Sequence, residues 1–329
     1  MSQRKISRRD FLYSGLIAGL SAVPVNIGIA FAQTDAQTAL PKRAASRLME
    51  DGQPSATALG AAKHRAAHQF LDIPKILDDP FALRIIGTNA ESALQANLWW
   101  YQLNRSLRAF IALRSRYAED ELARAIQRGV RQYVILGAGL DTFAYRNPYP
   151  GSRLRVFEVD HPATQSWKRV RLREEDIAIP ASLTFAPVDF ERQTLADGLN
   201  RAGFRAEESA FFSLLGVVMY LTKTAAMETF KFVASLPAGS EIVFDYSILP
   251  SMLNESQRLA HELRANLVAA GGEPWITFFD PSSLASELRG LGFKHVEDFG
   301  PEEANSRYFK NRTDSLRISG SGRLMKARL

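Results

Sequence analysis

The residues best suited to chemistry begin at a glycine turn in the middle of the chain. The apolar run Gln132–Leu136 is followed directly by Gly137-Ala-Gly139-Leu-Asp141-Thr142. Glycine has no Cβ atom, so a strand that ends in Gly-x-Gly lets the backbone approach a ligand closely. We expect a helix to follow the turn, because the free N–H groups at its start would add to such a site. The pattern predicts a ligand site at Gly137, Gly139 and Asp141.

Dinucleotide-binding enzymes have a similar turn, but one of their glycines is missing here. The third glycine of Gly-x-Gly-x-x-Gly would fall at position 142, which is Thr142. That glycine allows close packing of helix on strand beneath a pyrophosphate. The sequence therefore disfavours a dehydrogenase.

Acidic residues stand at the ends of the next two apolar runs. The first run ends Phe157-Glu158-Val159-Asp160. A carboxylate about 20 residues past the glycines can accept both ribose hydroxyls of a nucleoside. Asp160 is the better candidate because it ends the strand, and Glu158 points the same way under strand alternation. The second run ends Pro187-Val-Asp189-Phe190, where the acid can bond an adenine amino group while the ring packs on the base. The three strand ends together predict an adenosine site without a diphosphate.

A sheet must bring these strand ends to one edge. Apolar runs alternate with helical segments after residue 132, which indicates an α/β fold with a doubly wound, mainly parallel sheet. We expect strands at residues 132–136, 154–159, 183–188, 210–215, 241–246, 295–299 and 316–327. We expect helices at 56–70, in one or two long stretches of 94–127, at 222–234 and at 281–291. Residues 55–128 are thus predicted to form a helical segment and residues 129–329 the ligand-binding domain.

Composition excludes several kinds of site. The chain has no cysteine, which excludes disulfides, thiolate catalysis and cysteine-ligated metals. His64 and His68 have the spacing of one helix face, but the glutamate of a His-Glu-x-x-His motif is absent, so we expect no metal site. Part of the net charge of +6 lies in the first ten residues, and no basic stripe with interleaved aromatic residues follows. We expect no nucleic-acid partner.

Residues 1–32 have the three parts of an export signal. A basic head ends in Arg8-Arg9-Asp-Phe-Leu12, an apolar stretch follows, and Ala30-Phe-Ala32 is a small-x-small cleavage pattern. Paired arginines of this kind are typical of the twin-arginine route. We predict a twin-arginine signal peptide at 1–32, a linker at 33–54 and export to the periplasm or cell envelope. The alternatives are an uncleaved membrane anchor and a cytoplasmic protein whose leader is not made.

Taken together, the motifs resemble the bacterial branch of the leucine carboxyl methyltransferase family. The similar segments are residues 132–146, 157–162, 187–190, 215–222, 278–281, 292–293 and 307–309. The resemblance implies a seven-stranded, Rossmann-like class I methyltransferase sheet with an antiparallel seventh strand and an N-terminal helical lid. It also implies S-adenosylmethionine as methyl donor and a small-molecule methyl acceptor.

By position, the resemblance implies that Gly137, Asp160, Asp189 and Phe190 hold the cofactor. Arg114 matches the family's arginine that pairs with the methionyl carboxylate, and the fork of a guanidinium suits a carboxylate.

Two positions depart from the family pattern. Phe143 stands where many members have arginine, and Leu215 stands where a common version has glutamate. The second change leaves the donor's amino group with one partner fewer and makes the pocket more apolar. With Leu214 and the pair Trp99-Trp100, it suggests a small apolar acid or lipid-like acceptor.

The expected activity is O-methylation of a carboxyl or hydroxyl group. A carboxylate acceptor needs no general base, whereas a hydroxyl acceptor does. Tyr220, Tyr246 and His161 lie near the expected mouth, and we assign none of them as a base. Because S-adenosylmethionine is a cytosolic metabolite, an exported non-enzymatic protein that binds a nucleoside or another ligand is the alternative function.

Overall fold

The computed structural model describes residues 55–87, 89–149, 154–190 and 192–329, so the predicted leader and linker lie outside the described residues. These residues form a seven-stranded sheet in the order β3-β2-β1-β4-β5-β7-β6. The strands are β1 (Gln132–Leu136), β2 (Arg155–Asp160), β3 (Leu183–Pro187), β4 (Ala210–Leu214), β5 (Glu241–Ser247), β6 (His295–Phe299) and β7 (Gly322–Arg328). The first five pair in parallel, and β7 runs antiparallel to both β5 and β6. The predicted doubly wound sheet with an antiparallel strand is confirmed.

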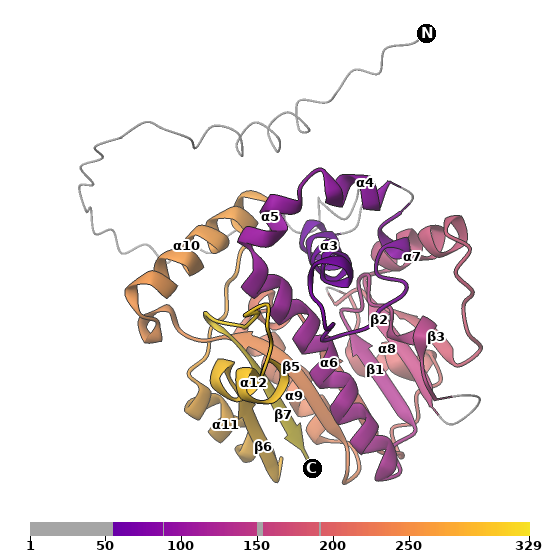
Figure 1. Ribbon diagram of the computed structural model, residues 1–329. Helices are drawn as coiled ribbons and strands as arrows, with labels where there is room; N and C mark the ends of the chain where they lie inside the picture. The colour runs from indigo at the N-terminus through magenta and orange to yellow at the C-terminus, as the bar shows by residue number, and fades with distance from the viewer. Residues whose placement is uncertain (1–54, 88, 150–153, 191) are drawn as a thin grey trace. The chain divides into compact units, whose positions relative to one another are not determined.

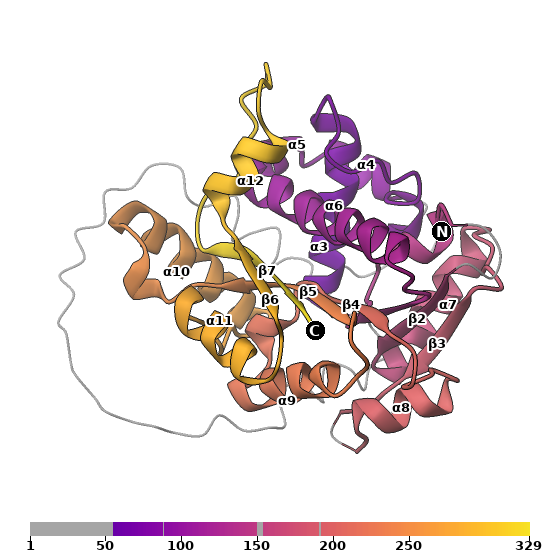
Figure 2. The same cartoon turned by 90° about the horizontal axis from the view of Figure 1, so that it is seen from below.

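Helices cover both faces of this sheet. The N-terminal helices are α3 (Ala56–Leu71), α4 (Ala90–Gln95), α5 (Leu98–Leu103) and α6 (Arg105–Gln127). The later helices are α7 (Pro162–Glu174), α8 (Leu195–Arg201), α9 (Lys223–Ala234), α10 (Glu255–Ala270), α11 (Pro281–Gly290) and α12 (Pro301–Tyr308). Short 3₁₀ turns lie at η1 (Arg84–Ile86), η2 (Phe143–Arg146), η4 (Val218–Tyr220) and η5 (Pro250–Met252). Figures 1 and 2 show α6 and α12 on one side of the strands and α8, α9 and α11 on the other.

The apolar core is divided by the sheet into two layers. Along β1, Val134 and Leu136 belong to one buried cluster, whereas Tyr133 and Ile135 belong to the other. Every residue of β1 is buried, as expected for a central parallel strand covered on both faces. This rigid core fixes where the strands end. In the described part of the chain, no helix is both long and apolar enough to cross a membrane.

Local sequence signals set the helix boundaries. Thr222 and Asp280 accept hydrogen bonds from backbone N–H groups in the first turns of α9 and α11, and Pro281 occupies the first position of α11. Asn254 and Gln257 form a reciprocal capping box at the start of α10. These caps satisfy N–H groups that have no partner within the helix.

Three expectations need correction. Residues 94–127 were expected in one or two helical stretches, but 90–127 form three helices, broken at Ala96-Asn97 and at Asn104. The last strand begins at Gly322, not at residue 316, because Gly320 adopts a positive φ of 97° and the chain turns there. The glycine turn after β1 leads into η2, a single 3₁₀ turn, and not into an α-helix.

Candidate functional site

The glycine turn after β1 is built from two positions that exclude side chains. Gly137 and Gly139 have φ values of +64° and +45°. A Cβ atom on Gly137 would lie 2.5 Å from a methyl group of Val217 in the loop after β4, and one on Gly139 would lie 3.3 Å from the Cβ of Ala58 on α3. The turn is therefore enclosed between helix α3 and the loop after β4, where only glycine fits without strain.

Buried polar side chains hold the next residues of the turn. The Arg65 guanidinium donates to the Leu140 carbonyl at 2.5 Å and to the Asp79 carboxylate at 2.7 Å. The Thr142 hydroxyl donates to the same carboxylate at 2.6 Å, which gives position 142 a polar role that glycine could not fill. Asp141 accepts from the backbone N–H of Phe143 at 2.8 Å and so starts η2. Arg65 and Asp141 therefore shape the turn.

Asp160 lies where β2 ends, beside this turn. Its carboxylate accepts from the N–H of Gly139 at 2.5 Å and from the N–H of His161 at 2.6 Å. Burial raises the pKa of this carboxyl, and the two N–H groups oppose that shift. Each carboxylate oxygen can accept more than one hydrogen bond, so capacity for a further donor remains.

Glu158 occupies a different environment from Asp160. Its side chain is fully buried, and Lys168 of α7 donates to its carboxylate at 2.7 Å and to the Asp141 carbonyl at 2.7 Å. Burial raises the pKa of Glu158 to about 7, although the Lys168 ammonium opposes the shift. The strand alternation that was expected to aim Glu158 at a ligand instead places it beneath α7. The contacts of Glu158 are those of a residue that packs α7 on β2. Of these two acids, Asp160 is the one at the sheet edge.

The third strand end presents an acid and an exposed ring. Asp189 is mostly buried, and its carboxylate lies 3.4 Å from the guanidinium of Arg192. The Phe190 ring is 60% exposed, which is unusual for a phenylalanine beside a buried sheet. An exposed ring at this position can take a planar ligand group on its face.

Arg114 reaches the same edge from the middle of α6. Its guanidinium lies 3.1 Å from the Asp245 carboxylate of β5, and that carboxylate also accepts from the N–H of Gly216. A Cβ atom on Gly216 would lie 2.7 Å from the guanidinium, so the glycine makes room for it. One nitrogen of Arg114 is thus used by Asp245, and the others remain as donors for a ligand anion.

Of the three residues near the expected mouth, Tyr220 is the one that contacts α3, through Thr57. The Tyr246 hydroxyl donates to Asp298 at 2.7 Å inside the fold, and the His161 ring accepts from the N–H of Ala163 as the cap of α7. Burial raises the pKa of Tyr220, and Glu273 adds to the shift while Arg114 opposes it. Tyr220 therefore keeps its proton near neutral pH.

Two neighbouring basic side chains, His64 of α3 and Arg264 of α10, lack polar partners among the described residues. His64 is buried against the Tyr101 ring at 5.2 Å, and its Nδ1 atom has no hydrogen-bond partner in the described structure. Burial lowers the pKa of His64 to about 3, and the charges of Arg108, Arg264 and Arg114 add to the effect. Arg264 of α10 forms no ion pair or hydrogen bond with any described residue, and burial lowers its pKa. Arg264 is therefore a cation close to His64 that has no acidic partner among the described residues.

His68 is accounted for by the fold. Its Nδ1 lies 2.7 Å from the Asp72 carboxylate, and its Nε2 accepts from the N–H groups of Ile76 and Leu77. Both ring nitrogens are thus used in a structural network, and Arg108 completes it with two hydrogen bonds to Asp72.

Some of the residues expected to form an apolar acceptor pocket lie elsewhere in the structure. Leu214 is buried in the core between the sheet and its helices and not in an open pocket. The Trp99 ring is 52% exposed, and Trp100 packs beside the cluster formed by Leu94 and Tyr101. Leu215 remains at the edge of the core, where it supplies no acid to a ligand amino group.

Sequence reasoning missed the residues that support the site. Asp79 holds both Arg65 and Thr142, but it was not among the expected site residues. Asp245 holds Arg114 from a strand that is buried throughout, and an acid in the middle of such a run was the available signal. No spacing in the sequence pairs Lys168 with Glu158.

Known proteins resemble this chain over most of its length. The family model for leucine carboxyl methyltransferase matches residues 58–234. The chain is 34% identical over 295 residues to YktD of Bacillus subtilis (strain 168), which is named among the S-adenosyl-L-methionine-dependent methyltransferases; the match covers 82% of this chain and 95% of YktD. A Mycolicibacterium paratuberculosis protein named in the same class is 33% identical over 223 residues, covering 63% of this chain and 69% of that protein. A crystal structure from Thermobifida fusca YX, titled as a methyltransferase, matches with a TM-score of 0.50 and 17% identity, covering 85% of this chain and 96% of the other.

Proposed function

The chain belongs to the leucine carboxyl methyltransferase family, and from that premise we propose that it methylates a carboxyl oxygen of a small organic acid. The fold is that of class I methyltransferases, and the methyl donor is S-adenosylmethionine. The choice of a carboxyl group as acceptor rests on Tyr220, His64 and Arg264.

The residues at the sheet edge fit S-adenosylmethionine, which supplies an already activated methyl group when bound. Asp160 retains acceptor capacity for ribose hydroxyls beside a turn that brings backbone close. Asp189 and the exposed Phe190 ring suit the adenine, and the free nitrogens of Arg114 suit the methionyl carboxylate. Leu215 leaves the amino group with fewer partners than in relatives that have an acid there. The convergence of these groups at one edge is the observation that carries the cofactor assignment.

The side chains of Tyr220 and His64 favour a carboxylate over a hydroxyl acceptor. A hydroxyl would need a base whose pKa lies near the working pH. Tyr220 holds its proton too strongly for that role, and an imidazole with a pKa of about 3, as in His64, accepts a proton too weakly. A carboxylate needs no base, and methyl transfer then depends on holding the two reactants close and aligned in a dry pocket.

Arg264 is the observation that favours an anionic acceptor. It lies on α10, close enough to His64 for its charge to lower the pKa of that imidazole, and has no acidic partner in the described chain. An arginine that is partly removed from water without an anion is unfavourable, and a substrate carboxylate would offset that cost. The exposed leucines of α10, Leu259, Leu263 and Leu267, are compatible with an acid that also has an apolar body.

A screen with a radiolabelled methyl donor tests the acceptor class. Each organic acid is compared with the alcohol of the same carbon skeleton, and a methyl ester is recognised by its release as methanol in base. We expect acids alone to be methylated. Arg264→Met should raise KM for the acid by roughly tenfold or more through loss of a charge-assisted contact. Arg258→Met, at an exposed site on the same helix, should not. Methylation of the alcohols, together with an unchanged KM for the acid in Arg264→Met, would contradict the proposal.

Export by the twin-arginine route is a separate proposal that rests on residues 1–32 alone. Arg8→Lys with Arg9→Lys should retain the protein in the cytoplasm, as shown by cell fractionation. Equal distribution of wild type and variant would contradict it. Tight donor binding without turnover on any acid would instead favour the exported, non-enzymatic protein.

A further inference from the structure

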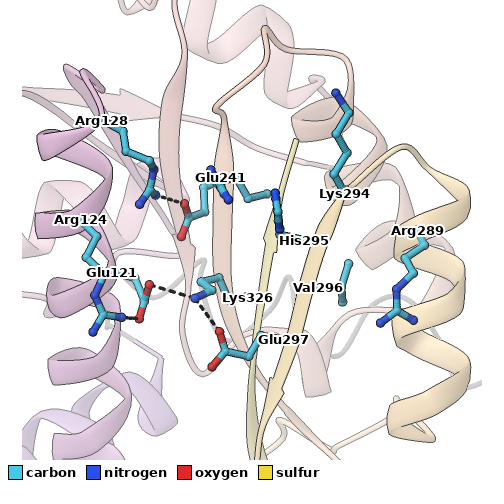
Figure 3. Close-up of a pocket in the computed structure, with 11 residues that line it drawn as sticks. Glu121, Arg124, Arg128, Glu241, Arg289, Lys294, His295, Val296, Glu297 and Lys326 are labelled. Atoms are coloured by element: carbon cyan, nitrogen blue, oxygen red, sulfur yellow. Dashed lines mark hydrogen bonds and ion pairs between the residues drawn. The ribbon is translucent and has the colours of Figure 1, made fainter.

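A charged cavity lies at the opposite edge of the sheet from the glycine turn. Its volume is about 410 Å³, and it is formed where β5 begins, beside β6, β7 and the C-terminal half of α6 (Figure 3). Strand register places Glu241, Arg328 and His295 in one row across three neighbouring strands. A cavity of this size suits a small molecule.

The lining of this cavity carries excess positive charge. Six arginine and lysine side chains line it against three glutamates. Figure 3 shows how the acids are used: Glu241 pairs with Arg128, Glu121 with Arg124 and Lys326, and Glu297 with Lys326. The three acids are therefore already matched by cations from α6 and β7.

Three cations remain, and they come from different elements. Arg289 lies near the end of α11, Lys294 precedes β6, and Arg328 ends β7. Their side chains form no hydrogen bond or ion pair within 4.0 Å with any residue that the structure describes. Arg289 and Lys294 are exposed and extend in different directions (Figure 3), and the charge of Arg328 acts on Glu241. Together the three cations leave a local positive field at the cavity.

A buried carboxyl group, that of Glu241, lies at this cavity and reduces its positive potential only weakly. Glu241 is 1% exposed, and its Oε1 atom has no hydrogen-bond partner among the described residues. Burial raises the pKa of Glu241 to about 7, although Arg128 and Lys326 oppose the shift. The Glu241 carboxyl is thus buried and already paired with Arg128, so it adds little repulsion against an anion in the cavity.

We propose that this cavity binds a small polyanion, a phosphate-bearing or polycarboxylate ligand held by Arg289, Lys294 and Arg328. Guanidinium groups bind phosphate and carboxylate through paired hydrogen bonds, and a lysine adds a point charge. The site is separate from the methyl-transfer edge and does not rest on the proposed function.

Calorimetric titration of the full chain with pyrophosphate, at constant ionic strength, tests this site. Wild type should bind saturably, and Arg289→Gln with Lys294→Gln should weaken binding roughly tenfold or more, because two charge-assisted contacts are lost. Arg173→Gln with Lys310→Gln removes two exposed cations elsewhere and should leave the affinity within about twofold. Citrate titrated in parallel distinguishes recognition of phosphate from recognition of charge alone.

The outcome is independent of methyl transfer. S-adenosylmethionine affinity should be the same in wild type and in the Arg289→Gln, Lys294→Gln variant, because neither residue reaches the glycine turn. Absence of saturable pyrophosphate binding, or equal weakening in both double variants, would overturn the proposal.

Discussion

Replacing Glu158 with glutamine tests whether this acid stabilises the fold or binds the cofactor. Burial raises its pKa from 4.5 to about 7, with Lys168 opposing the shift. Between these two values the folded protein holds a proton that the unfolded chain has released. The contribution of this group to stability is therefore fully present below pH 4.5 and is lost as the pH rises through about 7.

The size of the effect follows from the pKa difference. At about 1.36 kcal/mol per pKa unit, the titration of Glu158 removes about 3 kcal/mol of unfolding free energy across this range. Wild type should therefore lose about 3 kcal/mol more than Glu158→Gln between about pH 4.5 and about pH 7.5. Urea unfolding of both proteins at the two pH values measures the difference.

Cofactor affinity separates the two roles of Glu158. Since its carboxylate is buried beneath α7, Glu158→Gln should change the S-adenosylmethionine Kd by no more than about twofold. The single variant leaves the Lys168 ammonium without its acid, so Glu158→Gln with Lys168→Met, which has neither charge, is the control. The same pH dependence in wild type and both variants, or a large loss of cofactor affinity in the double variant, would refute the reasoning.

Three further substitutions test the roles of the edge residues. Arg114→Lys should weaken S-adenosylmethionine binding roughly tenfold in calorimetry, because one ammonium cannot serve both Asp245 and a ligand carboxylate; an unchanged Kd would exclude the pairing. Phe190→Ala should cost about 1–3 kcal/mol of cofactor binding through lost stacking, and Phe190→Tyr should restore it; equal affinities would place the adenine elsewhere. Tyr220→Phe should lower kcat by less than about tenfold at every pH, because a phenol that keeps its proton is no base; a fall of about 100-fold or more would show proton transfer.

Much of the sheet could be predicted because its strands are buried on both faces. The run Gln132–Leu136 begins and ends as expected, since a short apolar stretch closed by glycines leaves little choice. The predicted strand boundaries are wrong where tertiary contacts determine where a strand begins. Leu316 and Ile318 are apolar and buried, yet they pack beside α12 and not within the last strand.

Of the candidate site, too, one part could be predicted from the sequence and another part could not. Glycines and acids at strand ends could be located because parallel strands bring their carboxyl ends to one edge. Strand alternation alone could not separate Asp160 from Glu158, because the difference is made by Lys168 on a helix that packs over the strand. Arg114 and Arg65 are held by Asp245 and Asp79, and the sequence pattern does not show which arginine contacts which acid, although an acid within the buried run 241–246 marks Asp245 as unusual.

Calorimetric titration of the purified protein with S-adenosylmethionine tests the central claim most directly. Wild type should bind one equivalent, Asp160→Ala should abolish measurable binding, and Asp160→Asn, which keeps the shape of the side chain, should weaken it. Glu207→Ala, at an exposed acid away from the edge, is the matched control and should bind as wild type does. Folded wild-type protein that binds no S-adenosylmethionine, or Asp160→Ala protein that binds it with wild-type affinity, would contradict the account.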